Sequence, residues 1–577
     1  MATYGFGDGG GGPTMEMLEY QRRMEKGLPG FPKTMITTAK EHLETVEKNL
    51  TENSELLGRV PKWVGELYLE YHRGTYTSIA KNKRNNRKSE FAVAKAEFLS
   101  AVNSLVLGKK YPKEEIDEIW KLILLNQFHD VLPGSSIEEV YKDSDKQYAK
   151  LLEDCAGIIN GDIDIISKNI SSNGGLLVFN ANSTAVSSNA VLNGKTVEVK
   201  EIPAHGWKVV NPNELPKLSV TVKNNIVENR FYKIAFDSDG NIISFFDKEN
   251  ERDIVKPGRK FNEFIIFEDL PRDYDNWEIS EYYKSKSWKF GELEGLDNVY
   301  DGSRAGICIK RKYLNSTLKQ NIWLYSELAR VDFETEIDWH EHHQILKSFF
   351  PINVYTNKAV YDIQFGNVER NTHQNTSWDA AKFEVCAHKW ADLSDGSYGV
   401  SLINDCKYGH SCIGSDLSLT LLKCGTYPNP NADQGKHIFT YSILPHKGDF
   451  RTKTIPESYS LNQPLDVKFI EKQEGILPES FSFVSIDSEN AVIETIKQDE
   501  DGTGTILRLF DAHNARRNVK LTFGIPIKKA YICDMLENSI EEIAVVDNTV
   551  SLNLNNYEIS TVKIITERFG LYEENEK

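Results

Sequence analysis

The chain has 577 residues, more than a single hydrophobic core usually accommodates, so several domains are expected. Its hydrophobic content of 40% and charged content of 27% are those of an ordinary soluble globular protein. A formal net charge of −17 argues against nucleic acid or an anionic membrane surface as the main partner.

The seven cysteines are scattered without a C-x-x-C pair, which is typical of reduced thiols in a cytosolic protein. No apolar run approaches the roughly 18–20 residues of a membrane-spanning helix. The N-terminal residues also lack the basic and apolar regions of a signal peptide. We therefore expect a cytoplasmic protein with no membrane and no nucleic acid as partner, and a homo-oligomer is an open alternative to a monomer.

Residues 1–36 begin with a dense turn signal, Gly7-Asp8-Gly9-Gly10-Gly11-Gly12-Pro13-Thr14. Thr14 predicts the cap of a short helix over residues 16–25, which Gly27 and Pro29 would end. A loop this rich in glycine normally follows a strand or a helix, and a plain flexible loop is the alternative. We therefore interpret residues 1–36 as the last part of a domain that begins upstream.

Residues 37–165 show helical periodicity and predict a small antiparallel bundle. Pro112 suits the first turn of a helix that runs to Gln127, and a further helix is predicted over residues 137–158. Ser135 and Glu138 have the spacing of a capping box for that last helix. Other apolar residues at helical spacing are Val64, Leu67, Tyr68 and Tyr71, then Phe91, Ala94, Phe98, Val102 and Leu105.

The basic run Lys81–Lys88 is interpreted as a solvated helix face, in preference to a nucleic-acid patch. After about residue 174 the apolar period changes to two, which indicates half-buried strands. Asp239-Gly240 is a hairpin signal between two such strands. The pattern predicts stacked antiparallel β-sandwich domains over residues 170–470 and 471–577, and hence a multidomain α+β protein.

His129 and Asp130 end an apolar helix, and Pro133-Gly134 prevents its continuation. A neutral imidazole beside a carboxylate can bind a metal ion and also a polar substrate. The alternative is a helix-end histidine with one backbone hydrogen bond and an aspartate that acts as a polar cap. No partner ligand lies three or four residues away, so a metal here requires ligands from elsewhere.

Several other segments combine aromatic rings with polar groups, as sugar-binding sites do. Residues 65–78 are one such segment, and the alternative is a helix with one apolar face that is interrupted at Gly74. Residues 273–278, 375–379 and 405–410 are others, and each is alternatively a loop that packs its ring at a sandwich edge. The run His340-Glu341-His342-His343-Gln344 is rejected as a zinc-protease site because its fifth residue is glutamine.

Taken together, these segments resemble the glycoside hydrolase family 38 α-mannosidases of the cytosolic type. The motifs that carry the resemblance lie at residues 5–14, 65–78, 125–135, 267–277, 375–379, 402–409 and 432–437, in the order of the family. The resemblance implies a remnant of an α/β catalytic domain, a helical bundle and stacked β-sandwiches of the galactose-mutarotase-like supersandwich type. An unrelated β-rich binding module is set aside, because seven ordered matches would have to be accidental.

The resemblance further implies a retaining, zinc-dependent exo-α-mannosidase that removes terminal mannosyl residues from oligosaccharides. Retention requires two carboxyl groups about 5–5.5 Å apart across the scissile bond. By resemblance, His129 is a zinc ligand, Asp130 contacts the sugar, and Asp8 is a candidate acid/base. The candidate sugar-binding residues besides Asp130 are His72, Tyr76, Trp277 and Asp433.

The family places a His-x-Asp zinc motif and the nucleophilic aspartate upstream of the glycine-rich loop, where this sequence has no residues. Three of the four expected zinc ligands are therefore missing from the chain, and the zinc site is expected to be incomplete. The alternative to an active mannosidase is thus a catalytically incomplete fragment that at most binds mannosides. We also expect an exposed apolar patch beside His129 and a poorly anchored N-terminus.

Overall fold

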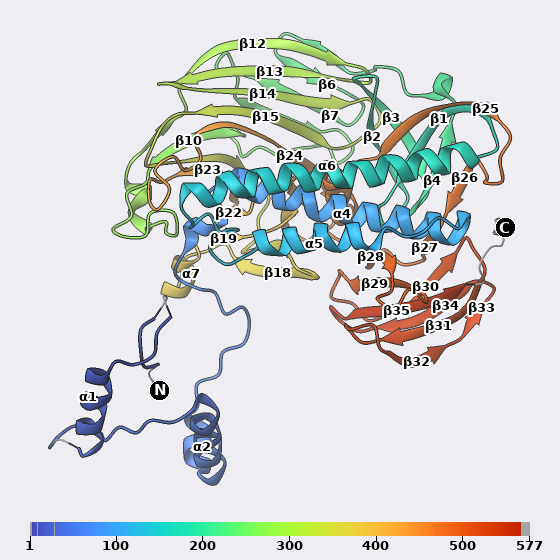
Figure 1. The fold of residues 1–577 in the computed structure, drawn as a ribbon. Coiled ribbons are helices and arrows are strands. Elements are labelled where there is room, and N and C mark those ends of the chain that lie inside the picture. The colour runs from blue at the N-terminus through green and yellow to red at the C-terminus, as the bar shows by residue number, and fades with distance from the viewer. Residues whose placement is uncertain (1–2, 8–9, 28, 567–577) are drawn as a thin grey trace. The chain divides into compact units, whose positions relative to one another are not determined.

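A computed structural model describes residues 3–7, 10–27 and 29–566 (Figure 1). Asp8, the predicted acid/base, lies outside the described residues. The chain divides into two compact units, Met1–Leu67 and Tyr68–Lys577. Within the described ranges, no helix is both long and apolar enough to cross a membrane.

The first unit contains three short helices, α1 (Met15–Glu25), α2 (Ala39–Glu52) and α3 (Ser54–Arg59). The Thr14 hydroxyl accepts the N–H of Met17, so the predicted cap and the helix after it are confirmed. Among the described residues of this unit, only the Gln21 side chain is buried. Its apolar residues are largely exposed.

The second unit opens with the predicted helical bundle, formed by α4 (Ala80–Leu107), α5 (Lys113–Asn126) and α6 (Glu138–Asn169) (Figure 1). These helices pack through a common apolar cluster. The short helices of this unit are η1 (Arg73–Tyr76), η2 (Pro212–Glu214), η3 (Glu281–Ser285), α7 (Ser377–Ala381) and α8 (Thr454–Asn462).

Three local predictions in the helical region are wrong. The helical spacing from Val64 to Tyr71 forms no helix, because Gly65 and His72 adopt positive φ angles of 120° and 58° that interrupt it. Ser135 is not the cap of α6, since the capping position is Ile137 and the Ser135 hydroxyl donates to Asp130. The basic run on α4 is not a solvated face, because Lys83 and Arg87 are buried.

The rest of the second unit is built of antiparallel strands, as predicted. The largest sheet has nine strands in the order β12 (Glu292–Asp301), β13 (Arg304–Tyr313), β14 (Ser316–Tyr325), β15 (Val331–Trp339), β24 (Gly435–Lys447), β21 (Tyr398–Asn404), β20 (Trp390–Ser394), β17 (Lys358–Ile363) and β18 (Gly366–Asn371). A six-stranded sheet has the order β11 (Ser287–Lys289), β10 (Glu263–Glu268), β16 (Gln344–Pro351), β23 (Asp416–Cys424), β22 (Gly409–Ile413) and β19 (Val385–Cys386).

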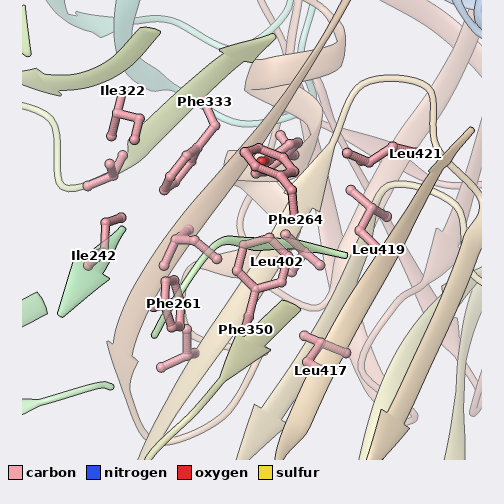
Figure 2. Close-up of a cluster of buried hydrophobic side chains, with 14 of the residues drawn as sticks. Ile242, Phe261, Phe264, Ile322, Phe333, Phe350, Leu402, Leu417, Leu419 and Leu421 are labelled. Carbon is pink, nitrogen blue, oxygen red and sulfur yellow. The ribbon is translucent and has the colours of Figure 1, made fainter. Parts of the chain in front are cut away.

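A five-stranded sheet completes this β region, with β5 (Thr221–Lys223), β6 (Ile226–Glu228), β7 (Tyr232–Phe236), β8 (Ile242–Asp247) and β9 (Arg252–Asp253). The predicted hairpin turn at Asp239-Gly240 joins β7 to β8, and Gly240 supplies the required positive φ of 74°. Residues of the three sheets bury their apolar faces in one cluster, which includes Phe261, Phe333, Phe350, Leu402 and Leu417 (Figure 2). Alternating burial along the strands therefore produces a sandwich core.

Smaller sheets connect the helices to the C-terminal strands. One has the order β25 (Asp466–Gln473), β1 (Ser172–Asn180), β4 (Gly206–Val210) and β26 (Ser480–Ser482), and another pairs β2 (Val186–Leu192) with β3 (Lys195–Ile202). The C-terminal sandwich combines β27 (Val484–Ile486), β30 (Arg517–Phe523), β34 (Thr549–Leu554) and β33 (Val545–Val546) with a second sheet of β28 (Ala491–Gln498), β29 (Thr505–Asp511), β35 (Ile559–Thr566), β31 (Ile527–Cys533) and β32 (Ser539–Ile543). All seven cysteines are free thiols.

Candidate functional site around His129 and Asp130

The turn that carries His129 and Asp130 follows directly after α5. It is closed by Asp130, whose carbonyl oxygen accepts the N–H of Ser135 at 3.2 Å and the hydroxyl of Ser136 at 2.9 Å. The Asp130 carboxylate accepts the Ser135 hydroxyl at 2.9 Å, and Tyr141 of α6 donates to the Asp130 carbonyl at 3.2 Å. Side chains from α6 and from the turn itself therefore fix a backbone that lacks regular structure.

The polar ends of His129 and Asp130 are open to solvent. The exposed fractions of the two side chains are 78% and 43%, and His129 Nε2 lies 3.3 Å from Asp130 Oδ2. The imidazole packs against the ring of Phe128, with a centroid distance of 4.4 Å. The pair is thus oriented by its own turn and can receive a ligand from outside.

Gly134 brings this turn against the segment that leads into α4. Its φ is 93°, and a Cβ atom at this position would lie 2.2 Å from the carbonyl oxygen of Ser78. The Asn276 amide donates to the Gly134 carbonyl at 3.0 Å, and the Ser78 hydroxyl donates to the Asn276 carbonyl at 2.6 Å. Three segments that are far apart in the sequence therefore meet at Gly134.

Lys83 of α4 ties the same turn from the inside of the protein. Its ammonium donates to the carbonyl oxygens of Ser78, Leu132 and Pro133 at 2.6, 3.0 and 3.0 Å. Burial lowers the pKa of Lys83 to about 7, whereas the negative charge of Asp433 favours its charged form. A buried lysine thus satisfies carbonyl groups that the Pro-Gly break leaves without helical partners.

The predicted sugar segment at His72 to Tyr76 forms η1 and lies against the Trp277 loop. The N–H of His72 donates to the Glu278 carboxylate at 2.9 Å, and Arg73 Nη1 lies 3.6 Å from the same carboxylate. A Cβ atom at Gly74 would lie 2.9 Å from the carbonyl carbon of Trp277. The structure therefore brings together two of the segments that the sequence singled out separately.

Trp277 is half-buried in a group of aromatic rings. Its ring meets that of Tyr274 edge to face at a centroid distance of 6.0 Å, and the ring of Tyr427 lies 6.2 Å away. Asp275 anchors this group, because its carboxylate accepts the N–H of Thr426 at 2.6 Å. Such rings offer an apolar face with polar edges, which suits the C–H surface of a sugar.

Asp433 occupies a buried position at the start of α4. Its two carboxylate oxygens accept the N–H groups of Ile79 and Ala80 at 2.6 and 2.7 Å. The helix has no cap from its own preceding residue, since Ile79 has a positive φ and no side-chain acceptor. The carboxylate therefore acts as a helix cap from a distant part of the sequence, and sugar binding by Asp433 remains a prediction.

Family models match most of the second unit. The "Glycosyl hydrolases family 38 C-terminal domain" matches residues 227–431, the "Alpha mannosidase middle domain" matches residues 70–165, and the "Glycosyl hydrolases family 38 C-terminal beta sandwich domain" matches residues 490–562. The chain belongs to glycoside hydrolase family 38. The predicted family resemblance is therefore confirmed, and so is the α+β organisation with helical and β-sandwich parts.

Relatives within family 38 are considerably longer than this chain. Alpha-mannosidase 2C1 of Homo sapiens is 33% identical over 97% of this chain and 55% of its own length. Alpha-mannosidase G of Dictyostelium discoideum is 32% identical over 98% of this chain and 58% of its own length. The chain thus spans a little more than half the length of these curated relatives.

A solved structure of an alpha-mannosidase has a similar fold. The crystal structure of an alpha-mannosidase from Enterococcus faecalis V583 superposes with a TM-score of 0.78 over 96% of this chain and 75% of that chain. The sequence identity is 16%, so this likeness shows the shared fold alone.

Zinc was predicted as cofactor, and the described side chains do not form a complete site for it. No group of three or more His, Cys, Asp and Glu side chains lies close enough to hold a metal ion within residues 3–7, 10–27 and 29–566. A closed tetrahedral zinc site needs four ligands, whereas His129 has Asp130 beside it on an open surface.

The predicted apolar patch beside His129 is confirmed. Leu124, Leu125 and Phe128 have exposed fractions of 60%, 58% and 57%, on the last turn of α5 and just after it.

Sequence reasoning missed Lys83, Asn276 and Gly134 as the residues that position the turn. A signal was present in Gly134, because a glycine after proline at a helix end often provides a close backbone approach.

Proposed function

We propose that this chain takes part in the removal of terminal α-mannosyl residues from oligosaccharides, by the retaining and zinc-dependent reaction that the family resemblance implies. The observation that carries the proposal is the exposed His129–Asp130 pair on a turn fixed by Ser135, Ser136 and Tyr141. A preorganised imidazole and carboxylate can bind hydroxyl groups without a large loss of conformational entropy.

Each exposed group has a chemical role in this proposal. The Asp130 carboxylate accepts hydrogen bonds from sugar hydroxyls, and the rings of Trp277 and Tyr274 present a stacking face. His129 is proposed as one ligand of the zinc ion. His72 and Tyr76 hold the segment that backs the Trp277 loop, and Asp8 remains the proposed acid/base.

A second candidate function is mannoside binding without turnover. The observation that favours it is the lack of a cluster of metal-ligating side chains around His129 in the described part of the chain. In this case the chain alone is a catalytically incomplete fragment, without the nucleophile and three of the zinc ligands, and it binds sugar weakly. We propose this state for the purified chain, and a cytoplasmic location in keeping with its free thiols.

Turnover and zinc content of the purified chain distinguish the two candidates. The chain is incubated with zinc and an aryl α-mannoside, and its metal content is measured by elemental analysis. We expect negligible turnover and less than one tightly bound zinc per chain. Turnover that His129→Ala abolishes and His340→Ala leaves intact would show a complete catalytic site, and stoichiometric zinc would show ligands not identified above.

Binding of methyl α-mannoside, followed by NMR, tests the sugar-contacting role of Asp130. Asp130→Asn is expected to weaken binding about tenfold, because a hydrogen bond to a charged group is lost. Asp143 on α6 is an exposed aspartate, so Asp143→Asn is the matched control and should bind like the wild type. Equal affinity of the Asp130 and Asp143 variants would contradict the proposal.

A further inference from the structure

Lys423 is a buried cation on β23, paired with a buried carboxylate. The exposed fractions of the Lys423 and Asp269 side chains are 0% and 1%, and Lys423 Nζ lies 2.7 Å from Asp269 Oδ2. A charge at such a depth needs a specific partner, because its transfer from water costs free energy. The pair is therefore not a surface ion pair that solvent and salt would screen.

Three neighbouring strands place the two charges at one end of the six-stranded sheet. Asp269 directly follows β10, and its N–H donates to the His343 carbonyl at 2.8 Å. His343 directly precedes β16, and its N–H donates to the carbonyl of Cys424, the residue after Lys423, at 2.6 Å. Because β10, β16 and β23 are adjacent in the sheet, these bonds fix the ends of all three strands. The charged pair thus lies on a rigid support.

Lys423 also contacts the loop that carries Trp277. Its ammonium donates to the Asp275 carbonyl at 2.5 Å and lies 3.9 Å from the carboxylate of the same residue. The next residue, Asn276, donates its N–H to the Tyr427 carbonyl at 3.0 Å. The backbone of the loop is therefore bonded to the sheet through Lys423 and to the segment that follows β23.

Close contacts restrict Lys423 to this arrangement. A Cβ atom at Gly74 of η1 would lie 2.8 Å from Lys423 Cε, and a Cβ atom at Gly425 would lie 2.9 Å from Asp275 Cγ. The lysine side chain is thus packed against η1 and bonded to the Trp277 loop. It connects the sheet to two of the segments that were predicted to bind sugar.

The loop that Lys423 contacts borders an open hollow of about 480 Å³, whose walls include Tyr274, Asp275 and Tyr427. Tyr274 and Tyr427 are 54% and 61% exposed. Exposed rings of this kind can stack on the C–H face of a sugar. They do so at the lowest cost when the loop is already ordered, because ordering it during binding would consume binding free energy.

We propose that Lys423 is a positioning residue for sugar binding: its ammonium holds the Asp275 carbonyl, and thereby the Trp277 loop, in the conformation that stacks on the ligand. This proposal rests on the function proposed above, in which Trp277 and Tyr274 form the stacking face. Asp269 balances the charge of Lys423, so its role is in stability and not in the conformation of the loop.

Two variants separate the anchoring of the loop from the balance of charge. Asp269→Asn removes the carboxylate and keeps the ammonium, whereas the double variant Lys423→Met/Asp269→Asn removes both charges and the donor to the Asp275 carbonyl. Lys310 and Asp297 form an exposed ion pair on β13 and β12, so Lys310→Met/Asp297→Asn is the matched control. Thermal unfolding checks that each variant is folded.

Fluorine NMR of the full chain, labelled with 5-fluorotryptophan, reports on the loop through Trp277, whose signal is assigned by its loss in Trp277→Phe. Asp269→Asn and the exposed control should keep the wild-type signal and the wild-type affinity for methyl α-mannoside. The double variant should shift or broaden the signal and weaken mannoside binding severalfold, because its loop is ordered only when the sugar binds.

The proposal is overturned if Asp269→Asn moves the Trp277 signal as far as the double variant does, since charge balance would then hold the loop. It is also overturned if the double variant leaves either the signal or the binding unchanged. If the wild type binds no mannoside, the function proposed above fails, whereas the Trp277 signal still decides whether Lys423 fixes the loop.

Hydrogen exchange of the wild type decides the question if the double variant does not fold. The N–H groups of Asn276 and Trp277 donate to the carbonyls of Tyr427 and Tyr274 at 3.0 and 2.9 Å. They should exchange as slowly as those of β23, because an anchored loop opens only together with the sheet. Exchange as fast as at Gly502, in an exposed turn, would overturn the proposal.

Discussion

Gly134 determines where the His129–Asp130 turn lies. Its positive φ and the absence of a side chain allow the turn to contact the Ser78 carbonyl, and the contact aligns the carbonyl oxygens that Lys83 binds. The exposed pair therefore depends on a residue that cannot itself contact a ligand. At the residue scale, the positions that orient the site are more restricted than the positions that face solvent.

Gly134→Ala is expected to destabilise the protein by about 3 kcal/mol or more, because a Cβ atom would overlap the Ser78 carbonyl and the φ angle would be strained. Thermal unfolding followed by circular dichroism measures the change. Gly157 on α6 has open space where a Cβ atom would lie, so Gly157→Ala should leave stability unchanged or raise it slightly. Similar unfolding curves for the two variants would contradict the role of Gly134.

Asp433→Ala is expected to lower stability by about 1–2 kcal/mol, because the first N–H groups of α4 lose their acceptor. Asp433→Asn keeps one acceptor oxygen and should recover part of the loss. Denaturant unfolding of both variants and of the exposed-site control Asp143→Ala gives the comparison. If Asp433→Ala unfolded like the wild type but lost mannoside binding, the sugar role would replace the capping role.

At the scale of elements, α4 holds the second unit together. It runs between the other helices and the β-strands, and its buried residues include polar groups such as Asn82, Lys83, Arg87 and Glu97 (Figure 1). A helix buried on many sides lacks a simple apolar stripe, which explains why its basic segment resembled a solvated face. Each of these polar groups needs a specific partner, and so the helix has a fixed position.

Glu97 of α4 gives stability a definite dependence on pH. Its carboxylate accepts the indole N–H of Trp120 at 3.0 Å, and burial raises its pKa from 4.5 to about 7. The folded protein thus holds a proton that the unfolded chain releases above pH 4.5, so stability falls as pH rises from 4.5 to 7. The loss is complete above the folded-state pKa and amounts to about 3 kcal/mol.

Glu97→Gln should therefore be more stable than the wild type at about pH 8, by up to about 3 kcal/mol, and this difference should vanish towards about pH 4.5. Denaturant unfolding at several pH values measures it. Glu118 is an exposed residue of α5, so Glu118→Gln should show no such dependence. A constant difference between Glu97→Gln and the wild type across pH would show that the carboxyl does not titrate in this range.

At the scale of the whole molecule, one hydrophobic core extends across the domain boundaries that were predicted from the sequence. One apolar cluster joins Val102 and Ile123 of the helical bundle to Leu507 and Val519 of the C-terminal sandwich. The strands β1 and β25 also pair, although almost three hundred residues separate them. The helical bundle and the C-terminal strands are therefore expected to unfold together.

Removal of residues 1–67 is expected to leave this cooperative unit intact. All apolar clusters of the described residues are formed by residues from Tyr68 onward. The shortened chain should keep the thermal midpoint of the full chain within about 2 °C, as measured by circular dichroism. Aggregation or a clearly lower midpoint would show that residues 1–67 stabilise the rest.

The sequence predicted the elements whose signals are local. The periods of the three bundle helices and of the strands, the cap at Thr14 and the Asp239-Gly240 turn all rely on neighbours within a few residues, and the structure confirms them, whereas the local signals at Val64–Tyr71 and Ser135 were wrong. The order of motifs was also sufficient to identify family 38. Of the site, the position of the His129–Asp130 pair just beyond a helix end followed from the Pro-Gly break.

Only the tertiary structure decided which of these segments meet. The cap of α4 by Asp433 and the Lys83 contacts with the turn join residues with no periodic relation in the sequence. Lys83 and Arg87 were interpreted from the sequence as part of a solvated face, but both are buried, with hydrogen-bond partners in other elements. Local pattern thus determined what each segment is, whereas long-range packing determined what each polar side chain does.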